Sequence, residues 1–151
     1  MKNYKLIWLG IFCCLQPLIL FAQRGAMIRK AFLDPKSDQV LVVAHRGNWR
    51  SAPENSVAAI DSAIQMGVDI VEIDIHKTKD GQLILMHDDR VDRTTNGKGL
   101  IKDYTLAEIK KLKLKDKDGN LTEHIVPTLE EALLAGKGQI MFNLDKAYYV
   151  F

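Results

Sequence analysis

The chain has 151 residues, of which 47% are hydrophobic and 26% are charged, as in an ordinary globular domain or part of one. Its formal net charge is +2, but Lys2 and Lys5 lie in an N-terminal segment that has the layout of a removable leader. Without them the 21 basic residues fall to 19, which equals the number of acidic residues. A neutral chain lacks the basic footprint of a nucleic-acid-binding protein, so we expect no nucleic-acid partner.

Residues 1–22 predict a secretory signal peptide. The segment has two lysines, an apolar run from Leu6 onward, and the small residue Ala22 at its end. The run is long for a signal peptide, so an uncleaved membrane anchor is the alternative, but Gln16-Pro17 interrupts it and favours cleavage. We therefore expect a secreted or periplasmic protein, which meets a membrane only through this segment if the segment is retained.

Both cysteines, Cys13 and Cys14, lie inside the predicted leader. The mature chain would therefore contain no disulfide and no thiolate metal site. Residues 23–39 follow as a lead-in, and the remaining chain, 40–151, has the signals of a single domain.

The domain begins with a predicted strand, loop and helix. Residues 39–44 (QVLVVA) form a continuous β-branched apolar run, typical of a strand buried on both faces of a parallel sheet. His45 would stand at the carboxyl end of this strand. After a polar loop, Pro53 is expected to open a helix with Glu54 in its first turn, and Gly67 to end it.

A second predicted strand, Val68–His76, carries two acidic residues. Strand alternation places Glu72 and Asp74 on the same face as Ile70. Burying two neighbouring carboxylates is costly unless a cation or protons lie between them. A divalent metal is the economical explanation, and a solvent-exposed strand face is the alternative.

Residues 82–89 (QLILMHDD) predict a third strand, whose direction the sequence leaves open. Asp80-Gly81 can close a hairpin, and the simplest register then places His87 opposite Asp74. In a parallel arrangement, the linker would run extended without a helix. Both arrangements place a histidine at the end of the sheet that carries the carboxylates.

The rest of the chain repeats helix and strand signals. Residues 139–145 (QIMFNLD) predict a fourth strand with Asn143 and Asp145 on one face. Alternating strands and helices indicate an α/β protein with its functional residues at the carboxyl ends of the strands. Capping-box spacing marks the start of two helices, at Thr105 with Glu108 and at Thr128 with Glu131.

The polar side chains at these strand ends suit the cleavage of a phosphodiester. His45 and His87 can donate and remove protons near neutral pH, and Arg46 suits a phosphate. The carboxylates of Glu72 and Asp74 suit a hard divalent cation.

An ordered series of short motifs resembles the glycerophosphodiester phosphodiesterase family: HRG (45–47), PENS (53–56), EID (72–74), TKDG (78–81), HDD (87–89) and RTTNGKG (93–99). The resemblance implies a TIM barrel with a small insertion after the third strand, from Asp88 to about Val126. A full barrel needs about 250 residues, so residues 40–151 would form only its N-terminal half. We expect either a piece of a longer protein or a chain that needs a partner.

The family resemblance also implies an activity, the metal-dependent hydrolysis of glycerophosphodiesters to glycerol 3-phosphate and an alcohol. It places the acid and base on His45 and His87, a phosphate contact on Arg46, and metal ligands on Glu72 and Asp74. The implied metal is Ca²⁺ or Mg²⁺. The glycerol hydroxyl beside the ester would attack phosphorus and form a cyclic phosphate, which water then opens with the two histidines exchanging roles.

The third metal ligand is a departure from the family pattern. Many members carry Glu-x-Lys in the strand where this chain has Asn143-Leu144-Asp145. We expect Asp145 to be the third ligand, because it is anionic and shares a face with Asn143. Glu54 is a further candidate, either as a ligand or beside one.

Two alternative functions stay open. The chain alone could be a catalytically silent fragment or a binding remnant of such an enzyme. Related phospholipases use a histidine pair and carboxylates on intact lipid headgroups, but the ordered HRG and PENS motifs weigh against this alternative.

Overall fold

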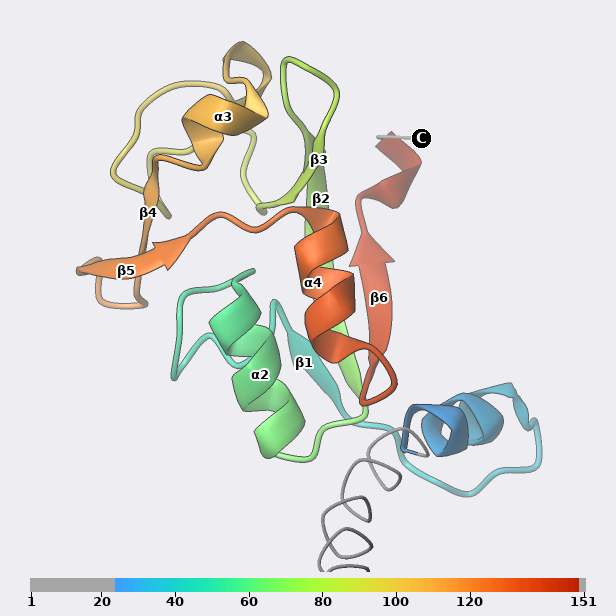
Figure 1. Cartoon of the computed structure of the whole chain (residues 1–151). Coiled ribbons are helices and arrows are strands. Elements are labelled where there is room, and N and C mark those ends of the chain that lie inside the picture. The colour runs from blue at the N-terminus through green and yellow to red at the C-terminus, as the bar shows by residue number, and fades with distance from the viewer. Residues whose placement is uncertain (1–23, 150–151) are drawn as a thin grey trace, which may run out of the picture.

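The structure is a computed structural model that describes residues 24–149. Its centre is β2 (Ile70–Lys77), which lies between two parallel neighbours, β1 (Val43–His45) and β6 (Met141–Asp145). The far end of β2 pairs instead with the antiparallel strand β3 (Leu83–Leu85), as Figure 1 shows. Because partners flank β2 along its length, six of its eight residues are buried.

Two helices, α2 (Val57–Gln65) and α4 (Leu129–Gly136), lie side by side on one face of the parallel strands (Figure 1). Their inward side chains and the apolar face of β2 form the main core. The buried members of this core are Ile60, Ala63, Val68, Val71, Ile73, Leu85, Ala132 and Ile140. The α/β architecture and the faces of β2 therefore agree with the sequence prediction.

Helix α2 begins later than expected. Its N-cap is Ser56, whose hydroxyl accepts a hydrogen bond from the Ala59 N–H at 3.0 Å. Pro53 and Glu54 precede the helix, because Asn55 adopts a left-handed conformation with φ of 56° that a continuous helix does not allow. The loop after β1 is correspondingly longer.

The first strand is shorter and more exposed than predicted. Val40, inside the expected strand, lies outside β1 and is 84% exposed, and Val42 is exposed as well. Within residues 24–149, β2 is the strand that pairs with β1, so the other edge of β1 has no neighbour to bury these side chains. The expectation of burial on both faces is wrong for the described residues.

The third predicted strand, β3, forms a hairpin with β2, which settles the direction that the sequence left open. The turn pairs the Thr78 N–H with the Gln82 carbonyl at 2.9 Å, so Met86, and not His87, donates its N–H to the Asp74 carbonyl. The expected register is therefore wrong by one residue. Since β3 is antiparallel, β6 is the third parallel strand and not the fourth.

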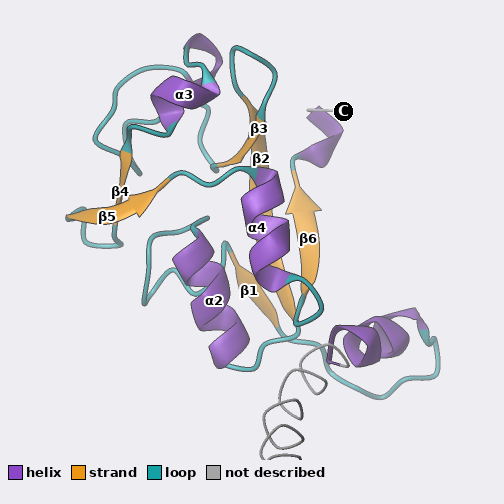
Figure 2. Ribbon diagram, in the orientation of Figure 1, coloured by secondary structure: helices purple, strands orange, loops and turns teal. Residues whose placement is uncertain are grey.

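The insertion follows this hairpin and has a core of its own. Its elements are η1 (Ile101–Asp103), α3 (Leu106–Ile109), β4 (Lys113–Lys115) and β5 (Leu121–Ile125). Figure 2 shows them grouped beside the parallel strands and not on them. Buried side chains of the insertion pack with Ile84 of β3 and with Met86, which follows this strand. The members of this second core are Ile84, Met86, Val91, Ile101, Ile109, Leu114 and Val126.

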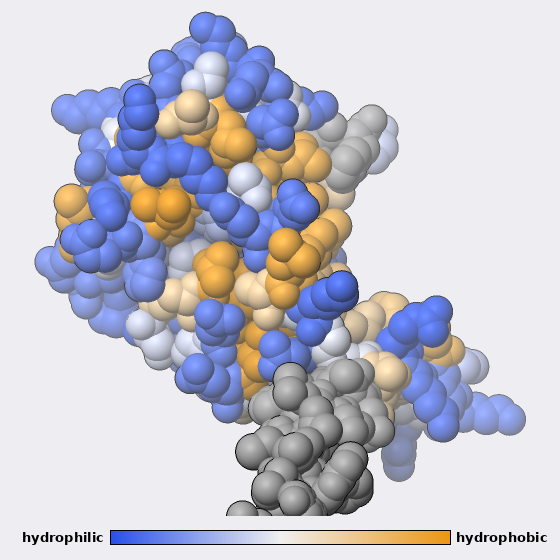
Figure 3. All heavy atoms as spheres, viewed as in Figure 1, coloured by the Kyte–Doolittle hydropathy of each residue, from blue (hydrophilic) through white to orange (hydrophobic). Residues whose placement is uncertain are grey.

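Both predicted capping boxes are confirmed, and they start α3 and α4. Helix α4 carries two exposed leucines, Leu133 and Leu134. Figure 3 shows an apolar area of the surface over this helix. Helix α4 contacts the main core through Ala132 and Leu129.

The expected lead-in contains a helix over residues 24–33. Arg24, in this helix, donates to the carbonyls of Gly67 and Val68, both at 2.7 Å, and so ties the helix to the segment just before β2. The predicted signal peptide lies outside the described residues, and export stays a prediction. No helix within 24–149 is long and apolar enough to cross a membrane.

The turn after β1 gives a prediction about stability. Gly47 and Gly81 have similar left-handed φ values of 75° and 79°, but an added Cβ at Gly47 would lie 2.8 Å from Ala59, whereas Gly81 has nothing within 4 Å. We expect Gly81→Ala to lower the free energy of unfolding by about 1–2 kcal/mol. Gly47→Ala should cost about 1–3 kcal/mol more, from overpacking. Equal losses in urea denaturation would contradict this reading of the β1 turn.

Candidate active site

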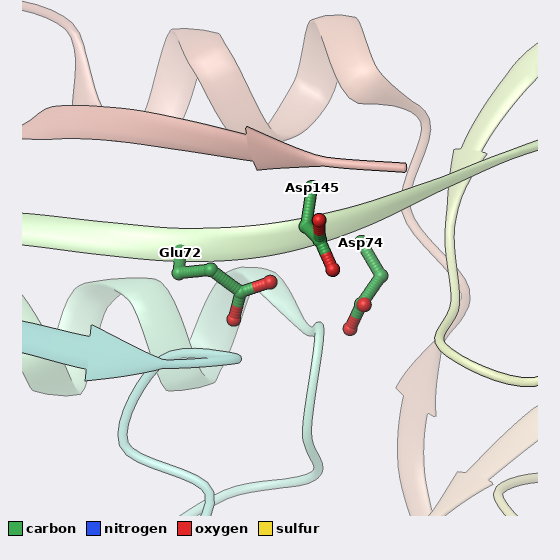
Figure 4. Close-up of side chains that lie close together, drawn as sticks. All are labelled: Glu72, Asp74 and Asp145. Carbon is green, nitrogen blue, oxygen red and sulfur yellow. The ribbon is translucent and has the colours of Figure 1, made fainter. Parts of the chain in front are cut away.

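Three carboxylates meet at the carboxyl ends of the parallel strands. The register pairs Asp74 with Asp145 and Glu72 with Asn143, which brings the acidic side chains of β2 and β6 onto one face. Oxygen atoms of Glu72, Asp74 and Asp145 lie within 4.8 Å of one another (Figure 4). Glu72 and Asp74 are buried and Asp145 is exposed, so the cluster opens to solvent on the β6 side.

His45, the last residue of β1, and Arg46, which follows it, border this cluster. His45 Nε2 lies 3.8 Å from Glu72 Oε2, and its side chain is 66% exposed. Arg46 has a left-handed φ of 56°, which turns its backbone N–H toward Glu72 Oε2 at 2.9 Å. Its guanidinium Nε lies 3.3 Å from Asp74 Oδ2. Arg46 therefore places both a backbone dipole and a positive charge against the buried carboxylates.

Asn55, in the loop before α2, is a site residue that sequence reasoning missed. It is 2% exposed, its amide donates to Asp74 Oδ2 at 2.8 Å, and its carbonyl accepts from the Asp74 N–H at 3.1 Å. The sequence does contain a signal for the conformation of Asn55. Asparagine is among the few residues that adopt the left-handed conformation readily, and here it precedes the serine that caps α2. Asn55 fixes the Asp74 carboxylate in place.

His87 lies two residues after the end of β3, the second strand of the hairpin. Its Nδ1 lies 2.7 Å from Asp88 Oδ1, and its backbone carbonyl accepts a hydrogen bond from Lys146 Nζ. Lys146 follows β6 with a left-handed φ of 60°, so it lies at the same end of the sheet as the carboxylates. His76 Nε2 lies 3.2 Å from the same carbonyl. The end of β6 and the end of the hairpin are thereby held together.

Glu54 lies outside the group of three carboxylates. Its Oε1 accepts from Arg46 Nη1 at 3.0 Å, and both of its oxygens accept from Arg93 at 2.8 Å. Arg93 also binds Asp88, the neighbour of His87. Sequence reasoning missed the part played by Arg93, since nothing in the chain order predicts that a residue of the insertion meets the β1 loop.

Burial and neighbouring charges shift the pKa values of Glu72 and Glu54 in opposite directions. Burial raises the pKa of Glu72, and the neighbouring charges of Asp74 and Asp145 act in the same direction. Burial also opposes ionisation of Glu54, but the hydrogen bonds and charge of Arg93 bring the pKa of Glu54 below its ordinary value. The positive groups beside Glu72 therefore do not offset its burial and the nearby carboxylates, whereas Arg93 and Arg46 do offset the burial of Glu54.

The donor set of the cluster fits a hard divalent cation. All three groups offer carboxylate oxygens, which such cations prefer, and the pKa of Glu72 is raised by burial and also by the charges of Asp74 and Asp145, an effect that a cation would relieve. Fold and site together define a class of protein, a partial α/β barrel that gathers carboxylates, histidines and an arginine at the carboxyl ends of its strands.

The model of the glycerophosphoryl diester phosphodiesterase family matches residues 45–148. The chain belongs to this family, which confirms the resemblance seen in the motifs.

Relatives and solved structures agree with this assignment. A glycerophosphodiester phosphodiesterase of Caldanaerobacter subterraneus is 45% identical over 109 residues, which cover 71% of this chain and 45% of the relative. A glycerophosphoryl diester phosphodiesterase structure from Parabacteroides distasonis has a TM-score of 0.71 at 35% identity, covering 81% of this chain and 43% of that one.

A phosphodiesterase structure from Oleispira antarctica, in complex with the product sn-glycerol-3-phosphate, has a TM-score of 0.65 and 39% identity, with 70% of this chain and 43% of that chain covered. The chain therefore spans less than half the length of these relatives and forms part of a TIM barrel, as predicted.

The raised pKa of Glu72 predicts a pH dependence of stability in the metal-free chain. A carboxyl whose pKa is higher in the folded state binds its proton more tightly there, so its contribution to stability grows as the pH falls through the folded pKa toward the ordinary glutamate pKa of 4.5. Glu72→Gln should remove this contribution. Urea denaturation in EDTA at a series of pH values measures it, with Glu123→Gln at an exposed site as the control. Parallel curves for the parent and Glu72→Gln would contradict the assignment.

Proposed function

We propose that this chain carries the acid–base, phosphate-binding and metal-binding residues of a metal-dependent glycerophosphodiester phosphodiesterase. Such an enzyme hydrolyses glycerophosphodiesters to glycerol 3-phosphate and an alcohol. The observation that carries the proposal is the group of three carboxylates within 4.8 Å, bordered by the histidine and arginine that end β1.

Glu72, Asp74 and Asp145 would hold the cation, Ca²⁺ or Mg²⁺. When bound, the cation would neutralise charge on the phosphoryl oxygens. Asn55 supports this role, because its two hydrogen bonds to Asp74 fix a ligand that would otherwise rotate.

The remaining residues supply binding and proton transfer. Arg46 would orient the phosphoryl group with its guanidinium, held in place by Glu54 and Asp74. One of the pair His45 and His87 would take the proton of the glycerol hydroxyl that attacks phosphorus, and the other would protonate the departing alcohol oxygen. The cyclic phosphate that results would be opened by water, with the two histidines exchanging roles.

A second candidate function follows from the extent of the chain. It spans less than half of its relatives, and within the described residues β1 and β6 each have one unpaired edge. The chain alone would then bind the cation or substrate without turning it over.

Release of glycerol 3-phosphate by the full chain tests the proposal. Glycerophosphocholine and glycerophosphoethanolamine are supplied with Mg²⁺, Ca²⁺ or EDTA. We expect metal-dependent turnover that falls by about 10²-fold or more in His45→Ala, the range that one acid–base group contributes. Glu72→Gln should lose the metal-dependent turnover, and Glu123→Gln should keep the turnover of the parent chain.

Turnover that EDTA and His45→Ala leave unchanged would overturn the proposed chemistry. No turnover from a folded chain that binds Mg²⁺ or Ca²⁺, with binding lost in Glu72→Gln, would favour the second candidate function for this chain alone.

A further inference from the structure

One motif of the sequence, RTTNGKG (93–99), has no part in the proposed chemistry. Its first residue, Arg93, has a side chain that is 49% exposed, yet its guanidinium makes four hydrogen bonds to two carboxylates. We infer that Arg93 is a positioning residue, which clamps Asp88 against His87 and thereby fixes the tautomer of that histidine. The inference rests on the proposed function in one respect, the part of His87 in proton transfer.

The clamp uses three nitrogens of the guanidinium. Nη1 and Nη2 of Arg93 donate to the two oxygens of Glu54, each at 2.8 Å. Nε donates to Asp88 Oδ2 at 2.8 Å, and Nη2 donates to Asp88 Oδ1 at 2.9 Å. Paired bonds to two carboxylates need the planar fork of arginine, which the single ammonium of lysine does not reproduce.

The insertion holds Arg93 in place through its own core. The N–H and hydroxyl of Thr95 both donate to the Val91 carbonyl, at 3.0 and 2.6 Å, and close the turn that presents Arg93. Val91 and Thr95 are fully buried. Lys115 Nζ adds a hydrogen bond to the Asp92 carbonyl at 3.0 Å. The backbone of Arg93 is therefore held by a hydrogen-bonded turn on a buried core, although the Arg93 side chain is half exposed.

Asp88 depends on this clamp for its orientation. It is the immediate neighbour of His87 in the chain, and its carboxylate is bound by the His87 ring on one side and by Arg93 on the other. The hydrogen bonds of Arg93 lower the pKa of Asp88 against the opposing effect of burial, so the carboxylate stays ionised. Without Arg93, the Asp88 side chain would be free to turn toward solvent.

An ionised carboxylate only accepts hydrogen bonds, which decides where the His87 ring carries its proton. At 2.7 Å from Asp88 Oδ1, Nδ1 of His87 must be the donor. The neutral ring then has an unprotonated Nε2, which can take a proton from a substrate hydroxyl or return one to a leaving oxygen. The reverse tautomer would place the lone pair on Nδ1, against a negative charge.

Glu54 extends the clamp to the phosphate-binding arginine. Its Oε1 accepts hydrogen bonds from both Arg93 and Arg46. A continuous series of alternating charges therefore runs through Asp74, Arg46, Glu54, Arg93 and Asp88, and it ends at the His87 ring. The insertion is thus part of the site geometry, through the side chains of Asp88 and Arg93.

The ring nitrogens of His87 report the clamp directly. In the full chain labelled with ¹⁵N, long-range proton–nitrogen spectra distinguish Nδ1–H from Nε2–H in the neutral ring, and His87→Asn identifies the signal among the four histidines. We expect the Nδ1–H tautomer in the parent chain. Arg93→Ala should shift the ring toward the Nε2–H tautomer, and Arg93→Lys should restore Nδ1–H only in part.

Arg90→Ala is the matched control, since Arg90 lies in the same loop and pairs with Asp92 outside the clamp. It should leave the His87 tautomer unchanged. An Nδ1–H tautomer that persists in Arg93→Ala would overturn the inference, because Asp88 would then hold the ring unaided. A parent chain with Nε2–H would overturn it as well.

The tautomer readout is independent of turnover, so failure of the clamp and failure of the proposed function can be told apart. Where the full chain does turn over substrate, Arg93→Ala should lower kcat by about 10- to 100-fold with little change in KM, since the substrate contacts remain and proton transfer is impaired. A rise in KM at unchanged kcat would assign Arg93 to substrate binding and overturn its positioning role.

Discussion

The burial of two like charges on the central strand is the constraint on which the rest of the site depends. Glu72 and Asp74 lie side by side on β2 with almost no access to solvent, and such a pair is unfavourable unless its charge is compensated. The loop after β1 supplies the compensation, with the backbone N–H and guanidinium of Arg46 and the amide of Asn55. Both of these residues take left-handed backbone conformations to reach the carboxylates. The carboxylates thereby determine the shape of the loop that carries the HRG and PENS motifs.

Much of this arrangement could be predicted because it is local or follows from strand alternation. The period of two places Glu72 and Asp74 on one face, and it selects Asp145 from β6 by the same rule. The capping boxes at Thr105 and Thr128 were readable for a similar reason, since serine, threonine and glutamate act within one helical turn.

The features that were missed depend on groups far apart in the chain. The extent of β1 is set by which strands lie beside it, and the start of α2 is set by the contact of Asn55 with a strand 19 residues away. Glu54 meets Arg93 across 39 residues, which no local pattern encodes. The hairpin register differed by one residue because the turn pairs Thr78 with Gln82, a detail of turn geometry that short polar segments specify weakly.

The separate core of the insertion has a consequence for how such proteins can diversify. Its apolar side chains pack mainly on one another and on Ile84 and Met86 of the hairpin, so loops between η1 and β5 can change in length and sequence with little effect on the main core. Exchange of this segment between relatives would therefore be tolerated by the fold. To keep the proposed acid–base site, the incoming segment must still bring an arginine to the position of Arg93. The insertion also meets the barrel elsewhere, since the Tyr104 carbonyl accepts from the Lys79 N–H and Lys110 pairs with Glu131 of α4, but Arg93 is the residue that joins it to Glu54.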